Sequence, residues 1–397
     1  MSNPAPIPFH RHSIGEEEIA EVVATLRSDW LTSGPRTARF EADFRQYAGA
    51  RHALAVNSGT AAMHLALAAL GIGPGDEVIT TPLTFASTVH VIVQCGATPV
   101  LADVGEDGNI DPAQVAARIT PRTKALLPVH LGGLPCDMER LWRLAAEHGL
   151  FVVEDAAHAS GTHTAAGPVG ASNANPARQS DAAAFSFYAT KNLATGEGGM
   201  LTTPHESLAE KMSLLRLHGI DRDIWRRDSW RYAVIEGGFK YNLSDILSAI
   251  GIHQLRKLEG FIEVRARHAE LYRELLADIR EIELPQAPRR GRHGWHLFSV
   301  RLRTELLSIG RDEFIRQLGE EGIGASVHFI PIPLHPYFEF LATEPRNACP
   351  RALELFPRLV SLPLYPAMTE ADVARVAGAV KSIVQSHKLR RAFAAGA

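Results

Sequence analysis

Between about residues 50 and 205 the chain alternates short β-rich runs with helical stretches of about ten residues. This alternation is typical of crossover units that build a mostly parallel sheet flanked by helices. The sequence therefore predicts an α/β fold with seven strands, of which the last can run in either direction. The predicted strands are 53–57, 77–80, 99–103, 125–129, 151–154, 182–187 and 200–203.

Helical patterns lie on both sides of this region. Ser13 and Glu16 have the spacing of a capping box, which predicts a helix to about residue 28. Residues 245–280 have helical periodicity, with a break predicted near Gly260. The stretch 161–180 is rich in Gly, Ala, Ser, Asn and Pro without a periodic apolar face, so we predict a loop there.

The order of these patterns suggests two domains. Residues 1–255 are expected to form the large domain, including the N-terminal segment. Residues 256–397 are expected to form a smaller C-terminal domain that includes the connecting helix, with α+β structure from about Glu281. A length of 397 residues and a hydrophobic content of 46% are sufficient for cores of this size.

Composition gives no reason to expect a nucleic acid, membrane or metal partner. The formal net charge is -3, like charges form no long block, and neither HExxH nor CxxC occurs. Three widely spaced cysteines fit no disulfide framework, and the first residues do not resemble a signal peptide. A cytoplasmic enzyme is the resulting expectation.

A candidate phosphate site follows the first strand, in Asn57-Ser58-Gly59-Thr60-Ala61-Ala62. Backbone N–H groups and the positive end of a helix dipole attract phosphate, Gly59 permits close approach, and the Ser58 and Thr60 hydroxyls can add hydrogen bonds. The alternative is that these hydroxyls form an ordinary helix N-cap.

An acidic side chain ends the strand 151–154, in Glu154-Asp155-Ala156-Ala157-His158. Ligands of open α/β sheets bind at the carboxyl ends of the strands, and a carboxylate there can keep a pyridine nitrogen protonated. The alternative is that Asp155 only caps the following turn.

A lysine stands just beyond the strand 182–187, in Ser186-Phe187-Tyr188-Ala189-Thr190-Lys191. If desolvation or a neighbouring charge keeps its amine partly neutral, Lys191 can form a Schiff base. A lone lysine is otherwise a solvated surface group. Phosphate anchor, carboxylate and lysine in this order are the groups that pyridoxal 5'-phosphate (PLP) requires.

These motifs, together with Trp30-Leu31-Thr32-Ser33-Gly34-Pro35 and Glu197-Gly198-Gly199, resemble those of the DegT/DnrJ-type nucleotide-sugar aminotransferases, which are fold-type I PLP enzymes. The resemblance runs from Ile7 to about Val384. It implies that Lys191 binds the cofactor and moves a proton, that Asp155 pairs with the pyridinium, and that Gly59, Thr60 and Ser186 hold the phosphate.

The same resemblance places Phe85 over the cofactor ring and His158 near its phenolic oxygen. Phe85 could instead be ordinary core, and His158 a structural histidine. The segment Gly238 to Asp245 resembles a stretch that reaches the phosphate of the neighbouring subunit, which implies a homodimer with shared active sites. Asn242 is the expected contact there, with Lys240 as the alternative.

Sugar-nucleotide contacts implied by the resemblance are Thr32, Gly34, Trp295, His296, His328 and Phe329. The aromatic residues among them could instead belong to the core of the small domain. Three basic residues could meet a diphosphate or face solvent: Arg222, Arg226 and Arg227.

The implied reaction transfers an amino group from L-glutamate, through the pyridoxamine phosphate form, to a nucleotide-linked keto-sugar. The Lys240-to-Leu243 stretch resembles relatives that act at C4 of UDP-4-keto sugars. The alternatives are amination of a 3-keto sugar and a regulatory protein that binds PLP without turnover. The related sugar dehydrases carry histidine at the lysine position, so Lys191 argues against that activity.

Overall fold

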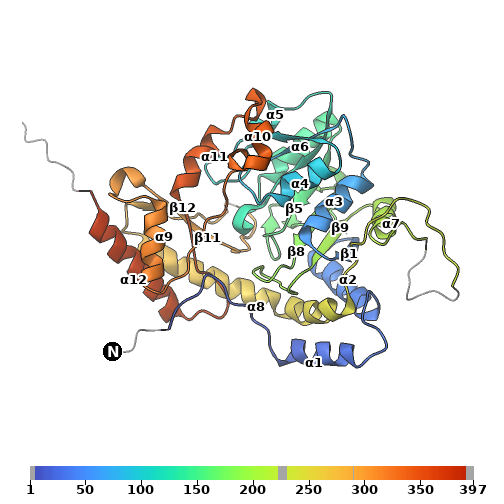
Figure 1. Ribbon diagram of the computed structural model, residues 1–397, viewed down its shortest axis with the longest axis horizontal. Coiled ribbons are helices and arrows are strands. Elements are labelled where there is room, and N and C mark those ends of the chain that lie inside the picture. The colour runs from blue at the N-terminus through green and yellow to red at the C-terminus, as the bar shows by residue number, and fades with distance from the viewer. Residues whose placement is uncertain (1–4, 222–229, 289, 390–397) are drawn as a thin grey trace, which may run out of the picture.

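The computed structural model describes residues 5–221, 230–288 and 290–389. Its centre is a seven-stranded sheet with the order β1-β9-β8-β5-β4-β2-β3 (Figure 1). Neighbours from β8 to β3 are parallel, whereas β9 is antiparallel to both β8 and β1. The predicted α/β fold with a mostly parallel sheet is confirmed, and its last strand in the sequence is the reversed one.

Every strand end lies within two residues of its predicted position. The strands are β1 His52–Val56, β2 Glu77–Thr80, β3 Thr98–Leu101, β4 Thr123–Leu127, β5 Phe151–Asp155, β8 Ala182–Ser186 and β9 Gly199–Thr203. The helices of this part are α1 Glu16–Leu26, α2 Pro35–Ala48, α3 Gly59–Ala69, α4 Ser87–Gln94, α5 Pro112–Ala116, α6 Met138–His148 and α7 Glu206–Leu215.

The strands are apolar on both faces, so helices cover both. On β8, Ala182 and Ala184 pack into the cluster that contains α3 and α7 residues, whereas Ala183 and Phe185 pack on the opposite side with α2. Successive strand residues point to opposite faces, and a continuous apolar run therefore needs cover on each side. As a result, β5 is buried from Val152 to Asp155, and β8 is buried along its whole length.

Helix α8, Asp245–Leu276, is continuous over 32 residues and passes below both the large sheet and the smaller C-terminal sheet (Figure 1). The predicted break near Gly260 is wrong. Leu258 and Ile262 on either side of Gly260 are buried against the α2 side of the sheet, and this packing outweighs the helix cost of one glycine, about 1 kcal/mol. The expected division after residue 255 falls inside this helix.

The C-terminal part contains a three-stranded antiparallel sheet, β10 Ile282–Glu283, β11 Phe298–Leu302 and β12 Leu359–Leu362. Its core includes Phe298 and Val300 from β11 and Phe314 from α9. The other elements here are α9 Arg311–Glu320, α10 Glu339–Ala342, α11 Pro350–Leu355 and α12 Glu370–His387. The predicted α+β character after Glu281 is confirmed.

Two local predictions need correction. Helix α1 begins after Gly15, whose backbone N–H donates to Glu18 Oε2 at 2.8 Å, so the capping pair is Gly15 and Glu18 rather than Ser13 and Glu16. The Ser13 carbonyl instead accepts a hydrogen bond from Gln254 of α8.

The segment 161–180 is not wholly a loop. It contains the short hairpin of β6 His163–Thr164 and β7 Gly167–Pro168, followed by a 3-10 turn at Pro176–Arg178. A hairpin this short has no room for a periodic apolar face, which is why the pattern missed it. Of the helices in the described ranges, none has the length and apolar character needed to cross a membrane.

Candidate active site

Asp155 ends β5 at the carboxyl edge of the parallel strands. Its side chain is 3% exposed; Oδ1 accepts a hydrogen bond from Ala157 N at 3.0 Å, and Oδ2 accepts one from Thr88 Oγ1 at 2.8 Å. Burial raises the pKa of Asp155, while these bonds and the charge of Lys191 oppose the rise. The turn cap that the sequence offered as an alternative thus exists, but it occupies only one carboxylate oxygen.

Lys191 lies in the turn after β8, where its backbone N–H donates to the Tyr188 carbonyl at 2.9 Å. Burial lowers the pKa of its amine to about 8, and the Asp155 carboxylate opposes this change. By its accessible surface the residue is half-buried, whereas a lysine of the ordinary kind is solvated. A lysine with such a pKa is a competent nucleophile and base near neutral pH.

The N-terminus of α3 meets the end of β8. Ser58 caps the helix, because its Oγ accepts from Ala61 N at 3.0 Å. The N–H groups of Gly59 and Thr60 open the helix and precede its intrahelical acceptors. A Cβ on Gly59 would lie only 2.8 Å from the Cβ of Ser186, so glycine allows this approach. Free N–H groups and the helix dipole thus form a cradle suited to phosphate beside Ser186.

Three neutral histidines lie near Lys191. Burial lowers the pKa values of His158, His296 and His328, and the charge of Lys191 lowers each of them further. His158 Nδ1 accepts a hydrogen bond from Gly132 N at 3.1 Å, so the neutral ring carries its proton on Nε2. The His158 ring lies 4.4 Å from that of His296.

Aromatic rings adjoin these histidines. Phe329 stacks on His158 at 5.7 Å, and Phe85 lies 6.0 Å from Phe329. Phe85 is 62% exposed and therefore is not part of the core. His328 Nδ1 lies 2.9 Å from Ser361 Oγ. Phe85, His158, His328 and Phe329 are thus brought together.

Trp295 differs from these residues. It is buried in the core of the small domain, where it stacks on His293 at 3.9 Å and neighbours Phe298. Its burial supports the core role that the sequence left as an alternative.

The sequence did not indicate the role of Arg265 in α8, a buried residue whose Nη1 donates to the carbonyls of Trp295, His296 and Leu364. An arginine within a helical pattern gave no signal of this role.

The predicted contacts Thr32 and Gly34 belong to the segment that leads into α2. Thr32 is exposed, whereas Gly34 is buried and donates its N–H to Asp245 Oδ1 at 2.8 Å. Asp245 also accepts from Thr37 N and Oγ1 and from Arg36 N. This buried carboxylate fixes the start of α2, and it too was missed, because its partners are distant in the sequence.

Lys240 and Asn242 lie beside the phosphate cradle of their own chain. The Lys240 carbonyl accepts from Asn57 Nδ2 at 3.2 Å, and Asn57 N donates to the Tyr241 carbonyl at 2.7 Å. Lys240 Nζ donates to Asn242 Oδ1 at 2.5 Å, and Asn242 Nδ2 donates to Ser33 Oγ at 2.7 Å. The three predicted arginines Arg222, Arg226 and Arg227 lie outside the described residues.

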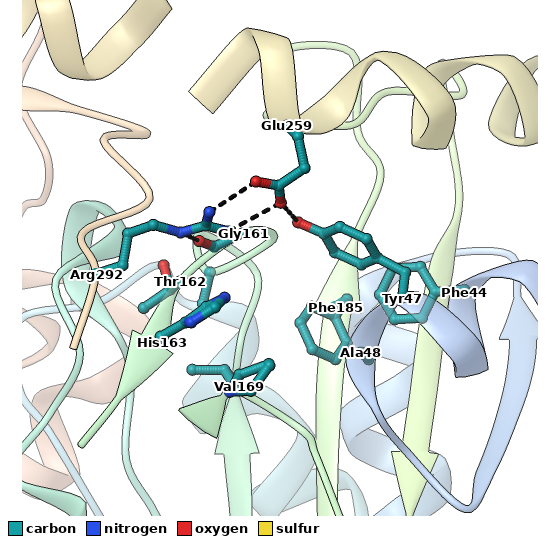
Figure 2. A pocket seen from close by; sticks show the side chains of 12 residues that line it. Phe44, Tyr47, Ala48, Gly161, Thr162, His163, Val169, Phe185, Glu259 and Arg292 are labelled. Atoms are coloured by element: carbon teal, nitrogen blue, oxygen red, sulfur yellow. Dashed lines mark hydrogen bonds and ion pairs between the residues drawn. The ribbon is translucent and has the colours of Figure 1, made fainter. Parts of the chain in front are cut away.

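A second cavity, away from these residues, is lined by none of the predicted site residues. It has a volume of about 220 Å³ and lies between α2, β8, the β6–β7 hairpin and α8 (Figure 2). Arg292 pairs with Glu259 through two bonds of 2.7 and 2.9 Å, and Tyr47 donates to the same carboxylate at its rim (Figure 2). The rim groups satisfy one another.

A smaller cavity borders Lys191. It is lined by the N-terminal residues His10 to Ser13 and by Arg265, so the N-terminal segment adjoins the lysine, which the sequence did not indicate. Within the described part of the chain, no group of three or more His, Cys, Asp or Glu residues is placed to hold a metal ion.

Comparisons with known proteins agree with this geometry. The model of the DegT/DnrJ/EryC1/StrS aminotransferase family matches residues 12–381. The chain is 47% identical over 385 residues to the spore coat polysaccharide biosynthesis protein SpsC of Bacillus subtilis, a match that covers 96% of this chain and 97% of that protein.

Two solved structures give the same result. The putative sugar aminotransferase Spr1654 of Streptococcus pneumoniae, solved in PLP and PMP forms, matches with a TM-score of 0.88 and 30% identity over 96% of this chain and 99% of that one. Helicobacter pylori PseC, an aminotransferase involved in the biosynthesis of pseudoaminic acid, matches with a TM-score of 0.88 and 28% identity over 96% and 100%.

The residues at the sheet edge fit the cofactor of these relatives. The Gly59 cradle suits a phosphate, the buried Asp155 carboxylate suits a ring nitrogen, and the Lys191 amine with a pKa of about 8 suits an aldehyde. The chain is a PLP-dependent sugar aminotransferase and belongs to the DegT/DnrJ/EryC1/StrS aminotransferase family.

Proposed function

We propose that this enzyme transfers the amino group of L-glutamate to C4 of a UDP-linked 4-keto sugar. The observation that carries the proposal is the amine of Lys191, whose pKa burial lowers to about 8 and whose charge acts on Asp155 and on three neutral histidines. Neutral imidazoles donate and accept hydrogen bonds without adding charge. They therefore suit the hydroxyl and keto groups of a sugar.

When bound, PLP supplies an aldehyde that links to amines and a ring that accepts electrons. We propose that the Gly59 and Thr60 N–H groups, with the hydroxyls of Ser58, Thr60 and Ser186, hold its phosphate. Asp155 would hold the ring nitrogen in its protonated form. Phe85 would cover the ring face, and Nε2–H of His158 would donate to the phenolic oxygen.

Lys191 carries the proton transfers in this proposal. Its Nζ takes the α-proton of glutamate in the first half of the reaction, and 2-oxoglutarate leaves. In the second half it returns a proton to the sugar carbon that receives the nitrogen. A pKa near 8 makes one group both an effective base and an effective acid close to neutral pH.

His296, His328 and Phe329 are the proposed sugar contacts, together with Thr32 and Gly34 for the nucleotide end; Trp295 would act through its neighbour His296. The choice of UDP and of C4 rests on the Lys240-Tyr241-Asn242-Leu243 stretch, whose resemblance to relatives of that specificity was described above. Amination of a 3-keto sugar is the alternative.

We also propose a homodimer in which Asn242, or Lys240, reaches the partner's phosphate site. In support, the segment 230–235 exposes four large apolar side chains, of which Trp230 is 82% exposed. Such exposure on one short segment marks a contact surface.

We also propose a cytoplasmic location. The three cysteines are free thiols, which a reducing compartment such as the cytoplasm favours.

The reaction is tested by its two halves. The PLP-loaded enzyme should release 2-oxoglutarate from glutamate in an amount equal to its active sites, and should then aminate a UDP-4-keto sugar. Mass spectrometry would measure the product and NMR would locate the new C–N bond. Lys191→Ala should bind PMP yet release no keto acid. A 3-keto sugar offered in place of the 4-keto sugar should not be aminated. Amination of only the 3-keto sugar, or turnover by the Lys191 variant, would contradict the proposal.

Shared sites are tested by mixing two inactive variants. If Asn242 serves the partner's site, a hybrid of Lys191→Ala and Asn242→Ala subunits has one site with both residues intact. Mixing should then restore activity to about a quarter of that of the unmodified enzyme, because half of the dimers are hybrids and each hybrid has one of two sites intact. No recovery despite formation of hybrids would exclude shared sites.

A further inference from the structure

The hydrogen bonds of Asp155 lead to a pair of hydroxyls that the reaction scheme does not use. Asp155 Oδ2 accepts from Thr88 Oγ1 at 2.8 Å, and Thr88 Oγ1 lies 2.8 Å from Thr84 Oγ1. An ionised carboxylate only accepts hydrogen bonds, so the single hydroxyl proton of Thr88 is committed to Asp155. Thr84 must then donate to Thr88. The hydrogen bonds therefore run in one direction, from Thr84 through Thr88 to Asp155.

Burial makes these hydrogen bonds important for the Asp155 carboxylate. Thr88 is 0% exposed, and Thr84 and Asp155 are also buried, so water does not replace these bonds easily. Burial favours the protonated form of Asp155, and its pKa is raised. Among the described residues, the donors to this carboxylate are Ala157 N and Thr88 Oγ1. Ala157 N donates to Oδ1 and Thr88 Oγ1 donates to Oδ2. The Thr88 hydroxyl therefore fixes the rotation of the carboxylate and stabilises the negative charge on Oδ2.

The turn that carries the hydroxyls also carries a cofactor contact. Thr84 and Thr88 are four residues apart where α4 begins, and Thr88 N donates to the Phe85 carbonyl at 3.2 Å. Phe85, between them, is the exposed ring assigned above to the cofactor face. The turn that leads into α4 and the first residues of that helix therefore carry both this aromatic ring and the hydroxyl that donates to Asp155.

We propose that Thr88, supported by Thr84, is a positioning residue that keeps the Asp155 carboxylate ionised and oriented toward the protonated ring nitrogen of PLP. The inference rests on the proposed pairing of Asp155 with that nitrogen. Thr88 itself does not touch the cofactor. Its effect is confined to the nitrogen end of the ring, and this restriction distinguishes it from a residue that only packs against α4.

The test measures binding of two ligands to apo-protein by equilibrium dialysis: PLP, and its deaza analogue, in which carbon replaces the ring nitrogen. Wild-type protein should prefer PLP. Thr88→Val keeps the shape but removes the hydroxyl, and should weaken PLP binding by about tenfold or more while leaving the analogue unchanged, since a hydrogen bond to a charged group is lost. Thr88→Ser keeps the hydroxyl and should retain the preference.

Other outcomes overturn the proposal in distinguishable ways. Equal loss of both ligands in Thr88→Val would mean general damage to the site, and unchanged binding of both would mean that Thr88 only fills space. Thr84→Val should lower the preference less than Thr88→Val does; a larger effect would contradict the direction of the chain. If wild-type protein binds PLP and the analogue with equal affinity, and Asp155→Asn does so too, Asp155 does not pair with the ring nitrogen. The proposed role of Thr88 is then also excluded.

Discussion

Lys191 should capture the aldehyde of PLP with an unusual pH dependence. Only the neutral amine attacks an aldehyde, and burial lowers the pKa of this amine from 10.5 to about 8. Each pH unit below the pKa reduces the neutral fraction about tenfold, so at pH 7 Lys191 has roughly 300 times the neutral amine of an exposed lysine. The capture rate should rise about tenfold per pH unit up to about pH 8 and level off above it.

The direction in which Asp155→Asn shifts the pH midpoint of capture distinguishes this prediction from a simple loss of the cofactor site. The Asp155 carboxylate raises the pKa of Lys191 against the effect of burial. Asp155→Asn should therefore move the midpoint of the capture profile further below 8, so that capture under saturating PLP becomes faster at neutral pH although turnover falls. A simple loss of the cofactor site predicts slower capture at every pH.

The assay mixes apo-enzyme with excess PLP from about pH 6 to about pH 10, traps the adduct with borohydride and quantifies labelled peptides by mass spectrometry. A short solvated peptide with one lysine, labelled in parallel, is the control, and its labelling should keep rising toward pH 10. A wild-type midpoint near 10, or a midpoint that rises in Asp155→Asn, would refute the reasoning from burial and charge.

Three further substitutions, the first with a control substitution beside it, test the supporting structure. Gly59→Ala brings a Cβ to 2.8 Å from the side chain at the end of β8 and should cost about 1–3 kcal/mol of unfolding free energy and weaken PLP binding, whereas Gly260→Ala, which faces open space, should not destabilise; calorimetry and dialysis would show both. Asp245→Asn removes the charge that holds the start of α2 and should cost about 1–3 kcal/mol by urea titration; a loss near zero would contradict the anchoring role. Arg346→Met breaks a two-bond pair with Glu77, whose pKa is lowered to about 2 chiefly by Arg346. Because the unfolded value is 4.5, the stability from this pair is full above about pH 4.5 and lost as pH falls toward 2, so the deficit of the variant should shrink in acid.

The sequence alone determined the sheet and the chemical groups of the site. Strand positions were predictable because apolar runs with polar ends are local patterns, and they reappear within two residues in the structure. Ser58, Asp155 and Lys191 were also predictable, since each follows a strand and parallel strands bring their carboxyl ends to one edge. Their order along the sequence indicates PLP as the cofactor without any tertiary contact.

Only the tertiary structure determined how those groups are held. Thr88 contacts Asp155 across 67 residues, and Asp245 contacts Thr37 across 208, so no local pattern could indicate either pair. The continuity of α8 through Gly260 and the burial of Trp295 likewise depend on what packs against them. The pKa of Lys191 follows the same rule, because its shift arises from burial and from a carboxylate on another strand, and both exist only after the sheet has formed.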